Sequence, residues 1–325
     1  MKIRHLIEEA FRKLSCGDAL GGGLSYRFDP RYEWLFLRDL RFQLVLNSGR
    51  YQYIKSTLSN ERLRNDVGAQ ACSLDGIEGS PLFLGRYTSG SQEYGILINS
   101  RPWGRHHFML VTLRCEPQVA TGDHILSALK LLRDLGNSYE GTFSSAKAGA
   151  SVQHFHVQYH EGEAAIWGNL KGRILDTYPV INERGVSTKF IKGWPAWAIA
   201  VSGRDETQVT YSICRVVDVC ENACSRLAYN LGMRHIRDEF EILIFPRIAG
   251  VEKPVALNAY PDSWGRFSFN EMGGSIVLLT AEGLQDTMRA PEQIWNAISD
   301  MSIPQPIQTH LIRELLPRSA RRVAD

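Results

Sequence analysis

Polar side chains that could act on a phosphate alternate with apolar ones in SVQHFHVQYH, residues 151–160. A period of two is typical of a β-strand, because successive side chains of a strand point to opposite faces. One face of this strand is therefore expected to carry His154, His156, Gln158 and His160. The other face is expected to carry Phe155, Val157 and Tyr159. The segment is thus predicted to be a strand with one chemical face and one packing face.

The chemical face suits nucleophilic attack on phosphorus. Alternate side chains of a strand lie roughly 7 Å apart, so His154 and Gln158 would flank a phosphate that His156 attacks. The imidazole pKa of about 6.5 keeps the neutral and protonated states accessible near neutral pH. Gln158 would donate its amide to a phosphate oxygen, and His154 would hold backbone or substrate through its second nitrogen. We expect His156 to face a pocket at the surface and to cost little stability when truncated.

Small residues lead into this strand. Gly149, Ala150 and Ser151 form the end of KAGAS, and small side chains let backbone N–H groups approach an anion closely. Ser151 adds a hydroxyl donor. Lys147 would add positive charge, although an exposed lysine is usually solvated surface.

Two other interpretations of the histidines compete with catalysis. A single histidine on a strand is usually a hydrogen-bonded structural residue, and we favour that reading for His160 taken alone. A zinc site would combine His154 and His156 with His107 or His160. Glutamine is a poor zinc ligand, the chain has no Cys-x-x-Cys, and no acidic residue accompanies the cluster before Glu161. We therefore expect no metal and no required cofactor.

Composition bounds the class of protein. The chain has 325 residues and a net charge of +2, from 37 basic and 35 acidic residues, which gives no bulk electrostatic case for nucleic acid or an anionic membrane. Six scattered cysteines favour a reducing compartment. The first residues, MKIRHLIEEAFRKL, predict an amphipathic helix and not a signal peptide. Because no run approaches the ~18 apolar residues of a membrane span, we expect a cytoplasmic protein without a membrane partner.

The order of elements predicts an α+β fold with a largely antiparallel sheet. Strands are expected in 31–47, 81–87 and 93–114, a helix in GDHILSALKLLRDLG, and then the histidine strand. The rest of the chain repeats a strand, helix, strand rhythm without a recognisable sequence repeat. We expect one intertwined unit over residues 1–325, with a catalytic half at 30–165, a second half at 166–290 and a C-terminal helical tail at 291–325.

The motif AGASVQHFHVQ resembles the active-site motif of the histidine triad superfamily, in its galactose-1-phosphate uridylyltransferase branch. In that branch the second histidine of His-x-His-x-Gln is the nucleophile and carries a nucleoside monophosphate. ILINSRPWGRHHFMLVT is similar to the preceding strand pair, which implies nucleotide-pocket roles for Asn99, Pro102 and His107. The resemblance also implies two histidine-triad-like halves fused in one chain, with an antiparallel sheet flanked by helices.

RFQLVLNSGRYQYIK resembles a segment of the GDP-L-galactose and related GDP-hexose phosphorylases, with Asn47 and Arg50 in register as candidate contacts for nucleotide or sugar. The diadenosine tetraphosphate phosphorylases share the histidine stretch and HHFMLVT. Two departures stand out. The zinc-binding cysteine pairs of the uridylyltransferases are missing, and the family's asparagine before the first motif histidine is replaced by Ser144 or Phe143, depending on alignment.

The resemblance implies phosphorolysis or transfer at the α-phosphate of a nucleoside diphosphate sugar. Its partners would be that substrate and inorganic phosphate or a phosphorylated acceptor, and a homodimer is a further expectation. Action on a dinucleoside polyphosphate is the alternative chemistry. A non-catalytic nucleotide-binding protein is the alternative of a different class.

Overall fold

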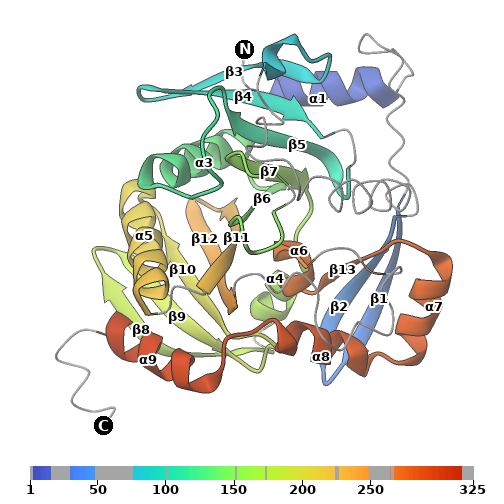
Figure 1. Ribbon diagram of the computed structural model, residues 1–325, viewed down its shortest axis with the longest axis vertical. Helices are drawn as coiled ribbons and strands as arrows, with labels where there is room; N and C mark the ends of the chain where they lie inside the picture. Colours follow the sequence, from blue (N-terminus) through green and yellow to red (C-terminus); the bar gives the residue numbers. More distant parts are fainter. Residues whose placement is uncertain are drawn as a thin grey trace, which may run out of the picture.

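Ten strands join edge to edge in one antiparallel sheet that runs through most of the molecule (Figure 1). A computed structural model describes residues 3–15, 30–47, 76–99, 102–150, 152–172, 174–223, 227–248, 264 and 267–316. In their order across the sheet, the strands are β3 (Phe83–Ser89), β4 (Gln92–Ile98), β5 (Arg105–Thr112), β7 (His156–Glu161), β6 (Tyr139–Ser144), β11 (Leu227–Ile236), β12 (Glu239–Ile248), β10 (Ala198–Gly203), β9 (Val186–Lys192) and β8 (Asp176–Glu183).

The strand order repeats between the two halves of this sheet. The first half runs β3-β4-β5-β7-β6, and from its outer edge the second half runs β8-β9-β10-β12-β11 in the same pattern. Each half carries one long helix between the third and fourth of its strands in chain order. These helices are α3 (Gly122–Leu135), between β5 and β6, and α5 (Glu206–Ala223), between β10 and β11. The halves meet at β6 and β11, where Ser144 pairs with Asn230. The predicted α+β class with an antiparallel sheet flanked by helices is confirmed.

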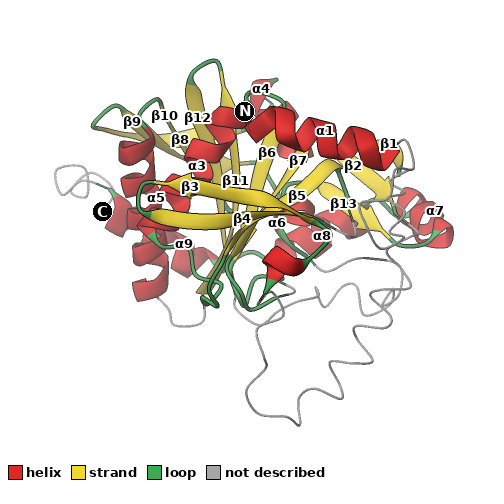
Figure 2. Ribbon diagram, turned by 90° about the horizontal axis from the view of Figure 1, so that it is seen from above, coloured by secondary structure: helices red, strands yellow, loops and turns green. Residues whose placement is uncertain are grey.

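Helices cover one face of the large sheet and bury the packing side of the histidine strand. The helices α3 and α5 lie on this face together with α1 (Ile3–Ser15) and α9 (Gln305–Leu315) (Figures 1 and 2). Their apolar side chains form one core with Phe155, Val157 and Tyr159, each of which is buried. The period-two pattern therefore places the predicted side chains in the core, because a strand presents alternate residues to each face.

A smaller sheet joins segments from both ends of the chain. The hairpin of β1 (Arg31–Leu37) and β2 (Leu40–Leu46) pairs in parallel with β13 (Ser275–Leu278). This sheet packs in a second apolar core beside the second half of the large sheet. The remaining elements are η2 (Ile77–Gly79), α4 (Ala165–Lys171), α6 (Phe269–Met272), α7 (Ala281–Arg289) and α8 (Glu292–Asp300). Among the described helices, none has the length and apolarity that a bilayer span requires.

Candidate active site

His156 begins strand β7 with its imidazole in a defined tautomer. Its Nδ1 lies 2.9 Å from the carbonyl oxygen of His154. A carbonyl oxygen can only accept, so Nδ1 carries the hydrogen and Nε2 keeps its lone pair. Within the described part of the chain, Nε2 has no hydrogen-bond partner. The nitrogen that a nucleophile needs is therefore the one left for a ligand.

The environment of His156 favours the neutral imidazole. Burial lowers the pKa of His156 below its ordinary value, and the charge on a protonated His154 would act in the same direction, while the hydrogen bond to the His154 carbonyl opposes the shift. The side chain is buried, with the residue only 4% exposed. The expectation of a surface-facing residue is therefore wrong: truncating His156 would leave the His154 carbonyl without its donor in the interior.

This lowered pKa predicts a pH dependence of folding. The unfolded imidazole titrates at about pH 6.5, so just below that pH the unfolded state binds a proton that folded His156 does not. Stability should therefore rise with pH between the folded and the unfolded pKa, and fall as the solution is acidified through that window. The free energy of unfolding, measured in urea at a series of pH values, should depend less steeply on pH in His156→Asn than in the wild type. Identical slopes would contradict the neutral, buried state of His156.

His154 precedes strand β7 and faces inward. Its Nε2 lies 2.7 Å from the carbonyl oxygen of Thr112 and 3.0 Å from the hydroxyl of the same residue. It is 0% exposed. The prediction that His154 lies within the strand is wrong, because the strand begins at His156. The backbone contact that we expected of His154 is present, since its ring ties the turn before β7 to the end of β5.

Gln158 lies two residues along the strand from His156, and its amide has one orientation. The backbone N–H of Trp103 donates to His107 Nδ1 at 3.2 Å, so the hydrogen of the neutral ring is on Nε2. That nitrogen lies 3.0 Å from Gln158 Oε1, which the indole nitrogen of Trp103 also approaches at 3.4 Å. Two donors therefore occupy the oxygen. The NH₂ group of Gln158 has no partner among the described residues, and it is the group left for an anionic oxygen.

Two of the predicted nucleotide-pocket residues, Asn99 and Pro102, lie between β4 and β5, and His107 follows on β5. The side-chain amide nitrogen of Asn99 lies 3.2 Å from His107 Nε2, but that ring nitrogen carries a hydrogen and so does not accept from it. Asn47, at the end of β2, donates its amide hydrogen to the Pro102 carbonyl at 2.8 Å. Asn47 thus links the small sheet to the turn that carries Trp103. Arg50 lies outside the described residues, so its predicted contact with nucleotide or sugar stays a prediction.

The small-residue loop before the histidines packs closely against the backbone at Phe267. Gly149 adopts a φ of +91°, and a Cβ there would lie 2.3 Å from the carbonyl oxygen of Phe267, so only glycine fits. Ala150 is buried and Lys147 is exposed. Ser151 lies outside the described residues. The loop therefore passes closer to the segment before α6 than any larger residue would permit.

Two buried amides at this loop were not predicted from the sequence. Gln118 bonds both the N–H and the C=O of His156, as well as the carbonyl of Ser144. Asn230, on β11, donates to the Ser144 hydroxyl and to the Ala148 carbonyl, each at 2.8 Å. Ser144 is one of the two positions at which the family's asparagine is missing. An asparagine from the second half, Asn230, therefore contacts the loop at this position. No local pattern distinguishes such residues from ordinary buried amides.

His160 has a structural environment. Its ring is 3.9 Å from the Trp103 ring, and its Nε2 lies 3.4 Å from the buried carboxylate of Glu140. Glu140 also accepts from the Trp167 indole and the Ala164 backbone. Within the described ranges, no group of three His, Cys, Asp or Glu side chains is arranged to hold a metal ion. The contacts of His107, His154 and His160 are instead those of residues that position the strand and Gln158.

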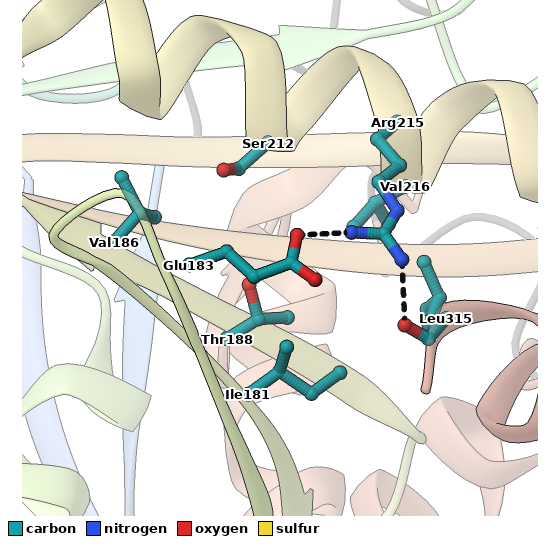
Figure 3. A pocket seen from close by; sticks show the side chains of 8 residues that line it. All are labelled: Ile181, Glu183, Val186, Thr188, Ser212, Arg215, Val216 and Leu315. Atoms are coloured by element: carbon teal, nitrogen blue, oxygen red, sulfur yellow. Dashed lines mark hydrogen bonds and ion pairs between the residues drawn. The ribbon is translucent and has the colours of Figure 1, made fainter. Parts of the chain in front are cut away.

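A small cavity lies apart from these residues, between the β8–β9 hairpin, α5 and the end of α9 (Figure 3). The guanidinium of Arg215 donates to the Glu183 carboxylate and to the Leu315 carbonyl at its rim. None of the predicted site residues lines this cavity. It therefore belongs to the packing of the second half against the last helix.

The fold can be compared with those of known proteins. No protein-family model and no curated protein sequence matches the chain. The solved structure of yeast Ap4A phosphorylase Apa2 in complex with Ap4A superposes with a TM-score of 0.66 at 14% identity, covering 93% of this chain and 97% of that one. Its complex with AMP gives the same score and identity over 94% and 98% of the two chains. The chain has the fold of this phosphorylase.

Proposed function

We propose that the chain transfers a nucleoside monophosphate from a phosphoanhydride substrate to inorganic phosphate through a covalent intermediate on His156. The observation that carries the proposal is the pairing of a neutral His156, whose Nε2 keeps its lone pair, with a Gln158 amide whose NH₂ group is left for a ligand. A nucleophile and a donor to the phosphate oxygens, two residues apart on one strand face, are the two groups that nucleotidyl transfer needs.

In the first step Nε2 of His156 bonds to the α-phosphorus, and the bond from that phosphorus to the bridging oxygen breaks. The leaving phosphate departs with the electron pair. Because Nδ1 already carries a hydrogen, the nucleotidylated ring is cationic, and the His154 carbonyl that accepts from Nδ1 stabilises this charge. Inorganic phosphate then attacks the same phosphorus, the P–N bond breaks, and Nε2 regains its lone pair as a neutral leaving group.

The substrate that we propose first is a nucleoside diphosphate hexose, such as a GDP-hexose, which would release a sugar 1-phosphate. The support is the resemblance of residues 41–55 to the GDP-hexose phosphorylases, together with the tether from Asn47 to the Pro102 turn. A dinucleoside polyphosphate is the second candidate. Its support is the shared fold with a phosphorylase that was solved in complex with Ap4A.

Purified protein should turn over one of these substrates repeatedly only when inorganic phosphate is present, because without phosphate the reaction stops after one equivalent has nucleotidylated His156. The assay offers GDP-hexoses and diadenosine tetraphosphate, each with and without phosphate, and follows the nucleoside diphosphate formed. Without phosphate, intact mass should increase by one nucleoside monophosphate, in an acid-labile and base-stable adduct. Binding of nucleotide without turnover or adduct would support the non-catalytic alternative and contradict the proposal.

A further inference from the structure

Gln118 makes a two-way contact with the backbone of the candidate nucleophile. Its Oε1 accepts from the His156 N–H at 2.8 Å, and its Nε2 donates to the His156 carbonyl at 3.1 Å. The same Nε2 donates to the Ser144 carbonyl at 2.9 Å. Gln118 belongs to the segment between β5 and α3, and it is 1% exposed. Three hydrogen bonds from one buried amide therefore converge where β7 begins.

The Gln118 side-chain amide takes the place of one backbone pair that β6 and β7 do not form. Strands β6 and β7 pair from Tyr139 and Glu161 as far as Thr142 and Gln158. Two residues further along, the same register would join Ser144 to His156, because backbone groups that face the same neighbour recur every second residue. Gln118 instead bonds to both strands at this point. The two strands thus separate around a side chain that satisfies their backbone groups.

The neighbouring contacts orient the whole turn. Phe155 donates its backbone N–H to the Glu116 carbonyl at 2.9 Å, two residues before Gln118. The His156 ring donates to the His154 carbonyl, which lies in the same turn. The segment 116–118 therefore lies alongside residues 155–156 and is hydrogen-bonded to both of them. If the backbone of His156 shifted, its ring would move with it.

We propose that Gln118 is a positioning residue, which holds the backbone of His156 so that Nδ1 reaches the His154 carbonyl and Nε2 points at the α-phosphorus. The catalytic part of this inference rests on the proposed function. Gln118 touches no reacting atom in this scheme. A misplacement of about 1 Å at a reacting group typically costs on the order of 10²-fold in rate, and that is the loss expected when the amide is removed.

A matched control exists elsewhere in the chain. Asn169, on α4, grips the backbone of Arg41 in the same manner: it accepts from the Arg41 N–H at 2.9 Å and donates to the Arg41 carbonyl at 2.9 Å. It is 0% exposed and it holds the small sheet. Asn169→Leu removes a comparable backbone clamp without touching the His156 turn.

The test compares Gln118→Met, which keeps side-chain length without hydrogen bonds, with Asn169→Leu and the wild type. Nitrogen-15 NMR of labelled histidine, assigned with His156→Asn, reports the tautomer and the titration of His156 without any substrate. We expect Gln118→Met to lose the Nδ1–H tautomer preference and to shift the titration of His156, and to form the nucleotidyl adduct about 10²-fold more slowly. Asn169→Leu should retain the wild-type spectrum and rate.

A second variant guards against a fold that does not tolerate methionine. Gln118→Glu keeps an acceptor for the His156 N–H but turns an oxygen toward the His156 and Ser144 carbonyls, so it should preserve only part of the rate. The inference is overturned if both Gln118 variants match Asn169→Leu in the tautomer, the titration and the rate. If the wild type itself forms no adduct but the NMR changes occur, the positioning role stands and the proposed function fails.

Discussion

Replacing His156 by asparagine should abolish nucleotidyl transfer while the protein remains folded. Asparagine places an amide N–H near the position of Nδ1 and keeps a donor for the His154 carbonyl, but it has no equivalent of Nε2. Loss of a covalent nucleophile typically lowers turnover by a factor on the order of 10⁴ or more. Alanine is the poorer choice, because it leaves a buried carbonyl unsatisfied at a cost of about 1–3 kcal/mol.

The measurements are phosphorolysis rate, intact mass after incubation with substrate, and unfolding in urea. His235→Asn is the matched control, since His235 is a buried histidine on β11 that packs against Phe240 in the second half. The control should keep both turnover and adduct. Full activity of His156→Asn would remove the assignment of the nucleophile.

A chemical rescue separates the nucleophile from a merely structural role. His156→Gly leaves space for an imidazole, so a nucleoside 5′-phosphorimidazolide supplies the missing group already bonded to the nucleotide. This variant should recover part of the second step and pass the nucleotide to phosphate, although it cannot use the natural substrate. The rescue is measured as nucleoside diphosphate formed above the uncatalysed background, and His156→Asn, which offers no such space, should show none.

Replacing Gln158 by alanine should slow transfer without abolishing it. One donor to a developing phosphate charge is typically worth about 10² to 10³ in rate, and the Gln158 NH₂ group is that donor in our scheme. His107 acts through Gln158, because its Nε2–H holds the amide oxygen. His107→Phe should therefore lower the transfer rate by releasing the Gln158 amide from its orientation. Its effect should be much smaller in a Gln158→Ala background, where there is no amide to orient.

The rates of the two single variants and the double variant form a cycle that measures this dependence. Additive effects would mean that His107 contributes independently of the Gln158 amide. The nucleotidyl adduct should still form in all three variants, since His156 is intact. An unchanged rate in Gln158→Ala would eliminate the amide as a donor to the phosphate.

The alternation in residues 151–160 predicts much of the local arrangement correctly. Phe155, Val157 and Tyr159 lie in the core beneath α3, while His156 and Gln158 share the opposite side of β7. The pattern fails for His154, which precedes the strand, because a period of two carries no information on where pairing with a neighbouring strand starts.

An internal repeat, which the family resemblance implied as two fused halves, is visible in the strand order. Its halves share an arrangement but no recognisable sequence pattern, since the same antiparallel layout can be built from many apolar residues. Strand β12, which corresponds to β7 in the second half, reads EFEILIFPRI and contains no histidine. The second half instead contributes Asn230, which donates to the loop before His154 and His156.

By itself, the sequence determined which residues could be nucleophile and donor, and which side chains share a strand face, because periodicity is a property of the local backbone. The tertiary structure alone decided which His156 nitrogen keeps its lone pair, which way the Gln158 amide points, and that Gln118 holds the backbone. The last two depend on partners 51 and 38 residues apart in the chain. The first depends on how a turn folds back on itself before β7. Hydrogen-bond geometry of this kind is fixed by packing, and spacing along the chain does not encode it.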